Sequence, residues 1–281
     1  MAVHDATLIS VRDELHISDV TAARAGKFMA QKLTNSGEIR EARMPLERLP
    51  LLTWFPALPL LLWQGRRVKR GALRLPEAAG NPYGHYAGSR PAIRLHILGE
   101  SPVCGVGVDH YDDSLGAQIA RELARISGQA VHWHAHGING IRLAQFNSLE
   151  RADRDADLVI VSFGVNDTTG LTRRARWRDG LHRLMTRLPP VPVVFLPVPP
   201  IQDFPLLPAP LRHFLGQRAR QLDTVLRQFC QARANAHYAE IQYELTPTML
   251  ARDGYHPSEI ACAQLARALA PQLLRQLNPR A

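Results

Sequence analysis

Cysteine, aromatic residues and long apolar runs are all scarce in this sequence of 281 residues. The three cysteines, Cys104, Cys230 and Cys262, are odd in number and far apart. They therefore form neither a disulfide scaffold nor a zinc site of the C-x-x-C type, and a reduced compartment is the plainest interpretation. No apolar run reaches the roughly 20 residues of a membrane-spanning helix, and the mean hydropathy is −0.17. These absences exclude a disulfide-rich secreted miniprotein and a multispan membrane protein.

Acidic residues are also in deficit. The sequence has 34 lysines and arginines but only 25 aspartates and glutamates, which gives a formal net charge of +9. Such a balance is typical of proteins that bind nucleic acid or an anionic membrane. Residues 1–43 are neutral overall, so the excess of basic residues lies after them and begins with Arg66, Arg67, Lys69 and Arg70. The arginines of the helix expected at 211–234 lack interleaved aromatic residues or a nucleic-acid-binding motif. We therefore interpret them as a solvated face and expect no nucleic-acid partner.

Residues 1–90 are predicted to form an N-terminal extension in three parts. Residues 1–43 hold six basic and six acidic residues and do not resemble a cleavable signal peptide, so we expect a cytoplasmic or membrane-associated protein. Met44 directly precedes the apolar segment, so we hypothesise that translation starts there and that 1–43 is an over-extended gene start. Residues 44–70 are an apolar and basic anchor or strap. Residues 71–90, rich in Gly, Arg and Pro, are predicted to be a linker or a wrap over the surface.

The apolar run at 49–63 has two tryptophans, three prolines and no charge. It is too short to span a bilayer, and Pro56 and Pro59 are expected to break a helix interior. One interpretation is a membrane-surface or re-entrant anchor, in which 49–70 makes peripheral contact with anionic lipid. The other is a proline-rich strap that packs its leucines on the globular domain. The sequence leaves both open.

From residue 91 onward the pattern predicts a catalytic domain, 91–281, in which strands alternate with helices. The expected strands are apolar runs at 93–98, 130–135, 156–163, 191–196 and 236–241. The expected helices have apolar residues at helical spacing and cover 114–126, 176–188, 211–234 and 257–277. Continuous apolar strands between helices indicate a parallel sheet buried on both faces. We therefore predict a three-layer α/β/α domain with a central parallel sheet of five strands.

Reactive side chains follow the ends of these strands, where doubly wound sheets bind their ligands. Ser101 follows the first strand and can act as a nucleophile if a base and an orienting carboxylate are near. Asp253 and His256 are three residues apart on one loop, a spacing that lets the carboxylate reach one imidazole nitrogen while the other faces Ser101. Asn166 follows the third strand and can donate to an oxyanion.

Four blocks in this order resemble the SGNH (GDSL-type) hydrolase superfamily over about residues 93–275. The blocks are I-L-G-E-S at 97–101, G-I-N-G at 137–140, G-V-N-D at 164–167 and D-G-Y-H-P at 253–257. The resemblance implies a flavodoxin-like fold and hydrolysis of esters or thioesters. It also implies that Ser101 is the nucleophile, His256 the base and Asp253 its orienting residue, with an oxyanion hole formed by Ser101, Gly140 and Asn166.

Two departures from the family pattern stand in these blocks. Glu100 occupies a position where most members have Asp, so we expect a local change in packing or hydrogen bonding without loss of activity. The second block has two glycines, of which Gly140 aligns best and Gly137 is the alternative. Asp167 is expected to hold its loop by hydrogen bonds. The G-x-S-x-G elbow of α/β-hydrolases is absent, because Ser101 lies in G-E-S-P-V.

Three further features lie near the expected site. The proline-rich segment 197–210 is either an acyl-chain wall lined by Phe204, Leu206 and Leu207 or a rigid loop that packs on the core. Cys104 is expected to be a buried or pocket-lining thiol. Three histidines alternate along the second strand and so share one face, which raises a metal site as an alternative: His132, His134 and His136. Because the implied mechanism needs none, we expect no metal and no cofactor.

Three functions remain to be distinguished. The first is a serine ester hydrolase of the esterase or lipase type, acting through an acyl-enzyme on small-molecule carboxylic esters of short to medium chain length. The second is a carbohydrate O-acetyl esterase or an acyltransferase on the same fold. The third, from a different class, is a non-catalytic protein that binds membranes or anions through 49–70.

Overall fold

The computed structural model describes residues 51–147, 155–243 and 245–278. The chain divides after Leu49, and all described residues belong to the second unit, Pro50–Ala281. The hypothesis that translation starts at Met44 falls on residues outside the described part, as does everything expected of 1–43.

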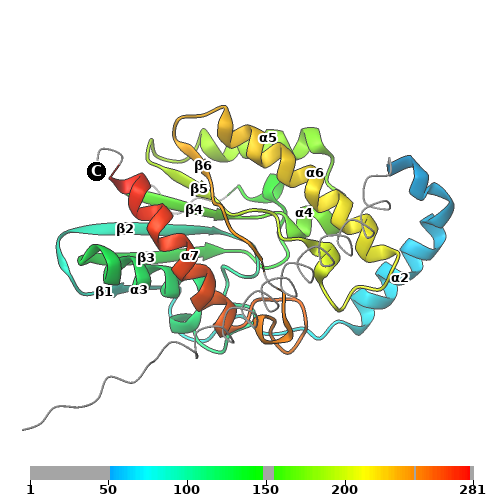
Figure 1. The fold of residues 1–281 in the computed structure, drawn as a ribbon, viewed down its shortest axis with the longest axis horizontal. Helices are drawn as coiled ribbons and strands as arrows, with labels where there is room; N and C mark the ends of the chain where they lie inside the picture. Colours follow the sequence, from blue (N-terminus) through cyan, green and yellow to red (C-terminus); the bar gives the residue numbers. More distant parts are fainter. Residues whose placement is uncertain (1–50, 148–154, 244, 279–281) are drawn as a thin grey trace, which may run out of the picture. The chain divides into compact units, whose positions relative to one another are not determined.

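A mixed sheet forms the centre of this unit (Figure 1). In the described part of the chain the sheet has six strands in the order β1-β3-β2-β4-β5-β6. Their bounds are Tyr83–Tyr86 for β1, Ser89–Gly99 for β2, Gln129–Gly137 for β3, Leu158–Ser162 for β4, Val193–Phe195 for β5 and Ala236–Tyr238 for β6. The five strands from β2 to β6 are parallel, and their order is the flavodoxin-like 2-1-3-4-5. The predicted fold class and parallel five-stranded core are confirmed.

The count of five strands is incomplete, because β1 adds an antiparallel edge strand beside β3. This strand lies inside 71–90, the segment predicted to be a linker, and β2 also begins before residue 91. The sequence of residues 83–86 is Tyr-Gly-His-Tyr, which is not an apolar run. In the structure these residues alternate between exposed and half-buried. Their strand conformation depends on pairing with β3, which lies about fifty residues further along the chain.

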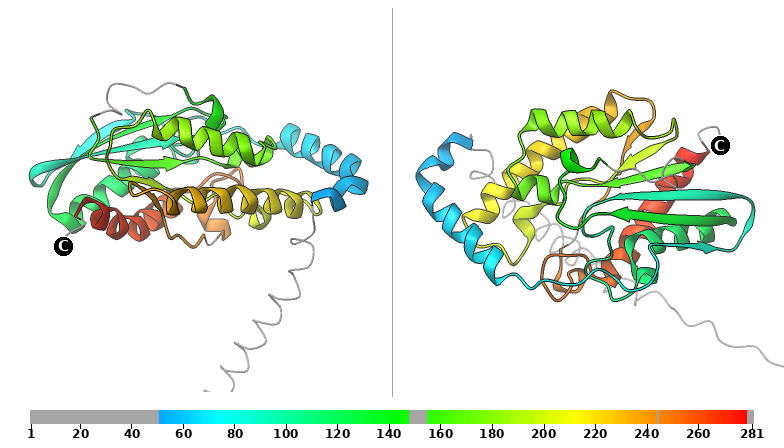
Figure 2. Two further views of the ribbon diagram at one scale, coloured as in Figure 1. Left: turned by 90° about the horizontal axis from the view of Figure 1, so that it is seen from above. Right: turned by 180° about the vertical axis from the view of Figure 1, so that it is seen from behind.

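Helices cover both faces of the sheet (Figures 1 and 2). The helix bounds are Leu58–Gly71 for α2, Leu115–Ser127 for α3, Val165–Thr169 for α4, Arg174–Met185 for α5, Leu211–Gln231 for α6 and Glu259–Leu277 for α7. Helices α3 and α7 pack together on one face, and α5 and α6 on the other. Neighbouring residues of β2 point to opposite faces of the sheet. Leu95 and Ile97 pack in the core under α3 and α7, and Leu98 packs in the core under α5 and α6.

Local signals explain where two helices of the first face begin and end. Ser114 caps α3 by accepting a hydrogen bond from the Ala117 amide, and Ser258 caps α7 by accepting from the Ala261 amide. Gly128 ends α3 in the left-handed conformation, with φ of 68°. The Ser258 cap sets the start of α7 directly after the D-G-Y-H-P block at 253–257.

The apolar segment before the sheet is helical, contrary to the expectation that its prolines prevent a helix. Pro59 lies in the first turn of α2, where no intrahelical partner for its nitrogen is needed, and Pro56 lies in the 3-10 turn η2, Leu51–Ala57. The α2 helix packs beside the N-terminal end of α6 (Figure 2). Among the helices of the described ranges, none has the length and apolarity needed to cross a bilayer.

Candidate active site

Ser101 lies in a tight turn directly after β2. The Val103 amide donates to the Glu100 carbonyl at 2.8 Å, and the Val106 amide donates to the Ser101 carbonyl at 3.1 Å. These bonds fold the chain back over the carboxyl edge of the sheet. The side chain of Ser101 is thereby held at the point between β2 and β4 where a flavodoxin-like sheet binds its ligand.

The structure brings Ser101, His256 and Asp253 into one hydrogen-bonded chain. His256 Nε2 lies 2.9 Å from Ser101 Oγ, and His256 Nδ1 lies 2.6 Å from Asp253 Oδ2. An ionised carboxylate only accepts, so the proton of a neutral imidazole stays on Nδ1 and donates to Asp253. Nε2 is then free to accept the Ser101 hydroxyl proton. This arrangement can convert a serine hydroxyl into a nucleophile.

Asp253 is held by its own loop as well as by the imidazole. Its Oδ1 accepts hydrogen bonds from the amides of Tyr255 and His256, both at 3.0 Å. Burial acts to raise the pKa of Asp253, but the hydrogen bonds from His256 and the two amides outweigh burial and lower that pKa below its ordinary value. The carboxylate therefore stays ionised beside the imidazole.

The loop that carries His256 is closed by backbone pairing on both sides of the block. The Ala251 amide donates to the His256 carbonyl at 2.8 Å, and Leu250 and Pro257 form an isolated antiparallel bridge. The Ser258 hydroxyl donates to the Thr248 carbonyl in the preceding segment. These contacts fix the imidazole toward Ser101.

Asn166, the expected oxyanion donor, lies in the first turn of α4. Its backbone amide and that of Val165 donate to the Glu100 carboxylate, at 3.0 and 2.8 Å. Glu100 is only 2% exposed, and burial raises its pKa to about 7 against the opposing effect of these hydrogen bonds. Glu100 thus connects the end of β2 to the start of α4. The sequence showed that Glu100 departs from the family pattern but gave no sign of these partners.

Gly140, the other expected oxyanion residue, occupies the third position of a turn over 138–141. The Ile141 amide donates to the Ile138 carbonyl at 3.3 Å, and Gly140 has a φ of +76°, which favours glycine. Gly137, the alternative, packs against the nucleophile turn, because a Cβ there would lie 2.7 Å from the Cys104 sulfur. The exposed position in the turn fits an oxyanion donor, whereas Gly137 has a packing reason to be glycine.

Asp167 joins the second and third blocks, in agreement with the expectation that it holds its loop. The side chain is fully buried, and its Oδ2 accepts from the Leu143 amide at 2.9 Å, at the start of the 3-10 turn η4, Leu143–Gln145. Burial raises the pKa of this carboxyl. Glu100 and Asp167 together connect the turns that hold Ser101, Gly140 and Asn166.

An apolar cavity of about 340 Å³ opens at Ser101 and His256. Ser101 and His256 form part of its wall, and the remainder is mostly apolar. Helix α7 contributes Leu265 and Ala268, which no pattern in the sequence pointed to. Other lining residues come from the loops at the carboxyl edge of the sheet and include Pro199, Phe204, Leu245, Met249 and Tyr255.

The three residues expected to form an acyl-chain wall differ in their placement. Phe204 lines the cavity, and its ring lies 5.2 Å from that of Tyr255. Leu207 is buried in the core on the α5 and α6 face, and Leu206 is 38% exposed. Neither leucine is among the cavity-lining residues. Segment 197–210 therefore contributes through Phe204 and Pro199, and part of it packs on the core.

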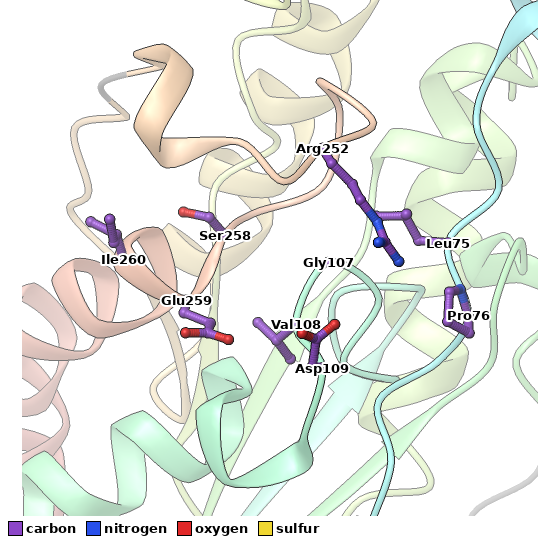
Figure 3. A pocket seen from close by; sticks show the side chains of 9 residues that line it. All are labelled: Leu75, Pro76, Gly107, Val108, Asp109, Arg252, Ser258, Glu259 and Ile260. Atoms are coloured by element: carbon purple, nitrogen blue, oxygen red, sulfur yellow. The ribbon is translucent and has the colours of Figure 1, made fainter.

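A second cavity of about 310 Å³ lies beside the loop that carries Asp253 and His256 (Figure 3). Its wall combines one arginine, Arg252, with the carboxylates of Asp109 and Glu259, and Figure 3 shows Arg252 extending toward Leu75. Ser101, Asp253 and His256 do not line it. This cavity is thus separate in composition from the apolar one, and the geometry gives it no part in the Ser101 chemistry.

The alternating histidines do not gather into a metal site. His132 stacks on His85, His134 lies against His96, and His136 packs on Phe146. In the described residues no group of three or more His, Cys, Asp or Glu side chains can hold a metal ion. Cys104 is buried, and burial raises the pKa of its thiol to about 12, so it is not a thiolate at neutral pH.

Comparisons with known proteins agree with this geometry. The sequence profile of the GDSL-like Lipase/Acylhydrolase family matches residues 97–261, more than half of the chain. The lipase/acylhydrolase from Enterococcus faecalis superposes with a TM-score of 0.53 at 20% identity, covering 67% of this chain and 99% of that one. The family 3 carbohydrate esterase of Clostridium thermocellum gives 0.53 at 18% identity, covering 67% and 98%. A sequence search of curated proteins returns no match. At these identities the structural similarity establishes the fold.

Proposed function

The chain belongs to the GDSL-like lipase/acylhydrolase family, and from this premise we propose that it is a serine ester hydrolase acting through an acyl-enzyme. The observation that carries the proposal is the hydrogen-bonded chain from Ser101 through His256 to Asp253, with 2.9 and 2.6 Å between its members. Binding alone does not require a serine, a histidine and an aspartate in one hydrogen-bonded chain at the opening of an apolar cavity, whereas ester hydrolysis does.

The proposed reaction has two halves. Ser101 Oγ attacks the ester carbonyl while His256 Nε2 takes the hydroxyl proton, and Asp253 stabilises the imidazolium that forms. The negative charge on the carbonyl oxygen is stabilised by the amides of Ser101 and Gly140 and by the Asn166 side chain. Collapse of this intermediate expels the alcohol, which receives the proton from His256. Water then releases the acid from Ser101 by the same route.

The acyl group is proposed to occupy the apolar cavity. Its volume of about 340 Å³ lies at the small end of the range for ligand pockets, roughly 300–1,000 Å³, which favours short-to-medium acyl chains over long ones. The apolar wall favours an aliphatic acid, since burial of each methylene contributes about 0.8 kcal/mol. A carbohydrate O-acetyl esterase needs no such space for its acyl group. The cavity therefore favours the aliphatic substrate over an acetylated glycan.

A fluorophosphonate probe tests the nucleophile. It should label the native protein and should not label Ser101→Ala. Ser162→Ala is the matched control, because Ser162 lines the same cavity from the end of β4, and this variant should still be labelled. Labelling that persists in Ser101→Ala would refute the assignment.

A series of p-nitrophenyl esters of increasing chain length tests the acyl site. Leu265→Trp places a larger side chain in the cavity and should move the preferred substrate to shorter acids. Leu274→Trp changes a partly buried leucine of the same helix that does not line the cavity, and it should leave the preference unchanged. A preference for acetyl esters in the native protein, with acetylated glycans the best substrates, would favour the O-acetyl esterase.

A further inference from the structure

One surface outside the catalytic site concentrates exposed apolar side chains. Eleven large apolar residues are exposed in the described part of the chain, and five of them lie within nine consecutive positions. These five, here called the apolar tip, are Phe55, Leu58, Leu60, Leu62 and Trp63. They belong to the 3-10 turn η2 and the first half of α2. Phe55 is 74% exposed and Trp63 55%, which is unusual for side chains of this size.

The apolar tip is anchored to the catalytic unit by its inner face. Trp54 and Leu61 are buried, and the Trp54 indole donates to Gln217 Oε1 on α6 at 2.8 Å. Gln64 is also buried: its amide donates to the Ala209 carbonyl at 2.8 Å, and its carbonyl accepts from the Leu211 amide at 3.1 Å. These bonds satisfy the buried polar groups and fix the orientation of α2. The exposed side chains therefore point outward from a rigid support.

Basic residues follow the apolar tip directly. Five exposed side chains, here called the basic collar, are Arg66, Arg67, Lys69, Arg70 and Arg74. The sequence contains no acidic residue from 50 to 76, and the Arg67 guanidinium lies 5.5 Å from the centre of the Trp63 ring. Exposed apolar side chains beside a cluster of cations on one helix are typical of helices that bind the interface of an anionic bilayer.

We propose that the apolar tip inserts into the surface of an anionic lipid bilayer while the basic collar binds the lipid headgroups. Apolar residues at the end of the segment, followed by cations one turn later, reproduce the order of acyl chains and phosphates in a membrane. Trp63 lies at the boundary, where tryptophan is favoured. The proposal is independent of the ester chemistry.

Two other occupants fit the surface less well. A second copy that pairs its apolar tip with this one would cover the apolar side chains, but its own segment 50–76 has no acidic residue to bind the basic collar. The chain's own residues 1–43 carry six basic and six acidic residues, so their net charge offers the collar no complement. An anionic bilayer satisfies both the apolar tip and the collar.

Vesicle flotation with the full chain tests the proposal. The vesicles consist of phosphatidylcholine alone or with phosphatidylglycerol, at low and high salt. The native protein should float with the anionic vesicles at low salt and bind the neutral ones far less. The triple variant Phe55→Ser, Leu62→Ser, Trp63→Ser should lose binding by at least about 100-fold, because three exposed apolar side chains no longer enter the bilayer.

A second variant separates the collar from the tip. Arg66→Gln with Arg70→Gln should weaken binding to anionic vesicles by about 30-fold, since each cation near such a surface contributes about 1 kcal/mol. The matched control, Arg178→Gln with Arg183→Gln, removes the same charge from exposed positions on α5 and should bind as the native protein does. Circular dichroism and thermal melting check that every variant folds.

Three results would overturn the proposal. The first is that the full chain does not float with anionic vesicles. The second is flotation unchanged by the triple variant. The third is a dimer, seen by analytical ultracentrifugation, that the triple variant dissociates, because it would assign the apolar tip to a second copy.

Discussion

Two buried carboxylates belong to the site around Ser101, Glu100 next to it in the chain and Asp253 beyond His256. They accept similar backbone hydrogen bonds but have pKa values shifted in opposite directions. Asp253 accepts two backbone amides at 3.0 Å, and Glu100 accepts two at 2.8 and 3.0 Å. Burial acts to raise both pKa values, yet that of Asp253 falls below its ordinary value while that of Glu100 rises to about 7. Asp253 also accepts a hydrogen bond from the His256 imidazole at 2.6 Å, and its hydrogen bonds together outweigh burial. Glu100 is the more deeply buried of the two and lies near Asp167, so burial and this like charge outweigh its hydrogen bonds, which include one from the Asn166 side chain.

The difference assigns the two carboxylates separate tasks. Asp253 stays ionised and orients the imidazole, so we expect it to act on the proton transfer itself. Glu100 does not contact His256 in the geometry above; it holds the amides of Val165 and Asn166 and so sets the position of the expected oxyanion donor. We infer that Glu100 is a positioning residue. The four predictions below test this division, in order of decreasing effect.

Asp253→Asn should reduce kcat on a soluble p-nitrophenyl ester by about 10³–10⁴-fold, because an amide in this position favours the wrong imidazole tautomer. Steady-state kinetics at pH 8 provide the measurement. Asp109→Asn removes an exposed acid from the second cavity and should leave kcat unchanged. A loss below tenfold for Asp253→Asn would show that the orienting role is misassigned.

Glu100 should make the stability of the native protein fall as the pH rises through neutrality. Its pKa is about 7 in the folded protein against 4.5 ordinarily, so the folded state binds the extra proton between these values. Above pH 7 the buried charge should cost about 3 kcal/mol that is absent below pH 4.5. Urea unfolding of native protein and Glu100→Gln at pH 5 and pH 8 measures this. The native protein should lose stability relative to the variant by about that amount on going to pH 8, and a pH-independent difference would contradict the pKa.

Glu100→Gln should lower kcat by about 10- to 100-fold while KM changes little. A glutamine side chain has one acceptor oxygen and one NH₂ group, so it cannot accept from both backbone amides as the carboxylate does. The start of α4 and Asn166 should therefore shift. The upper bound of the expected loss in kcat is that of removing one oxyanion donor. Glu100→Asp keeps the charge and should recover most of the activity. If KM rises with kcat unchanged, Glu100 contributes to substrate binding instead.

Asp253 should itself add no pH dependence to the stability between pH 5 and pH 8. The folded-state pKa of Asp253 lies below its ordinary value of 3.8, so its stabilising charge is complete throughout this range and is lost only at more acidic pH. Urea unfolding of His256→Gln with and without Asp253→Asn measures this, because glutamine can still donate to the carboxylate but does not titrate. Stabilities that depend on pH in parallel would agree, and a difference in slope near neutrality would contradict the lowered pKa of Asp253.

The sequence predicted the parallel core and the reactive residues because both leave local signals. Apolar runs mark β4 and β5, which are buried on both faces, and three of the four blocks contain the residues now joined by hydrogen bonds or held in the α4 turn. Strand β1 has no such signal, because Tyr83 and its neighbours become a strand only by pairing with β3. Helix α2 was missed because Pro59 suggested a break, although proline fits a first turn.

Long-range packing explains what the sequence did not reveal about the site. The Glu100 carboxylate reaches amides 65 and 66 positions away, a pairing that no spacing rule predicts. The cavity wall formed by α7 depends on how that helix packs against the carboxyl edge of the sheet. Leu206 and Leu207 were proposed with Phe204 from their composition alone, and only the folded path of the segment separates them.

Detection of a covalent acyl-enzyme would show directly whether Ser101 is the nucleophile. The native protein is mixed with a medium-chain p-nitrophenyl ester and quenched in acid within the first turnover, and its peptides are analysed by mass spectrometry. The acyl group should be found on the peptide that contains Ser101, with no such adduct and no hydrolysis in Ser101→Ala. An adduct on another residue, or hydrolysis by Ser101→Ala at the native rate, would contradict this prediction.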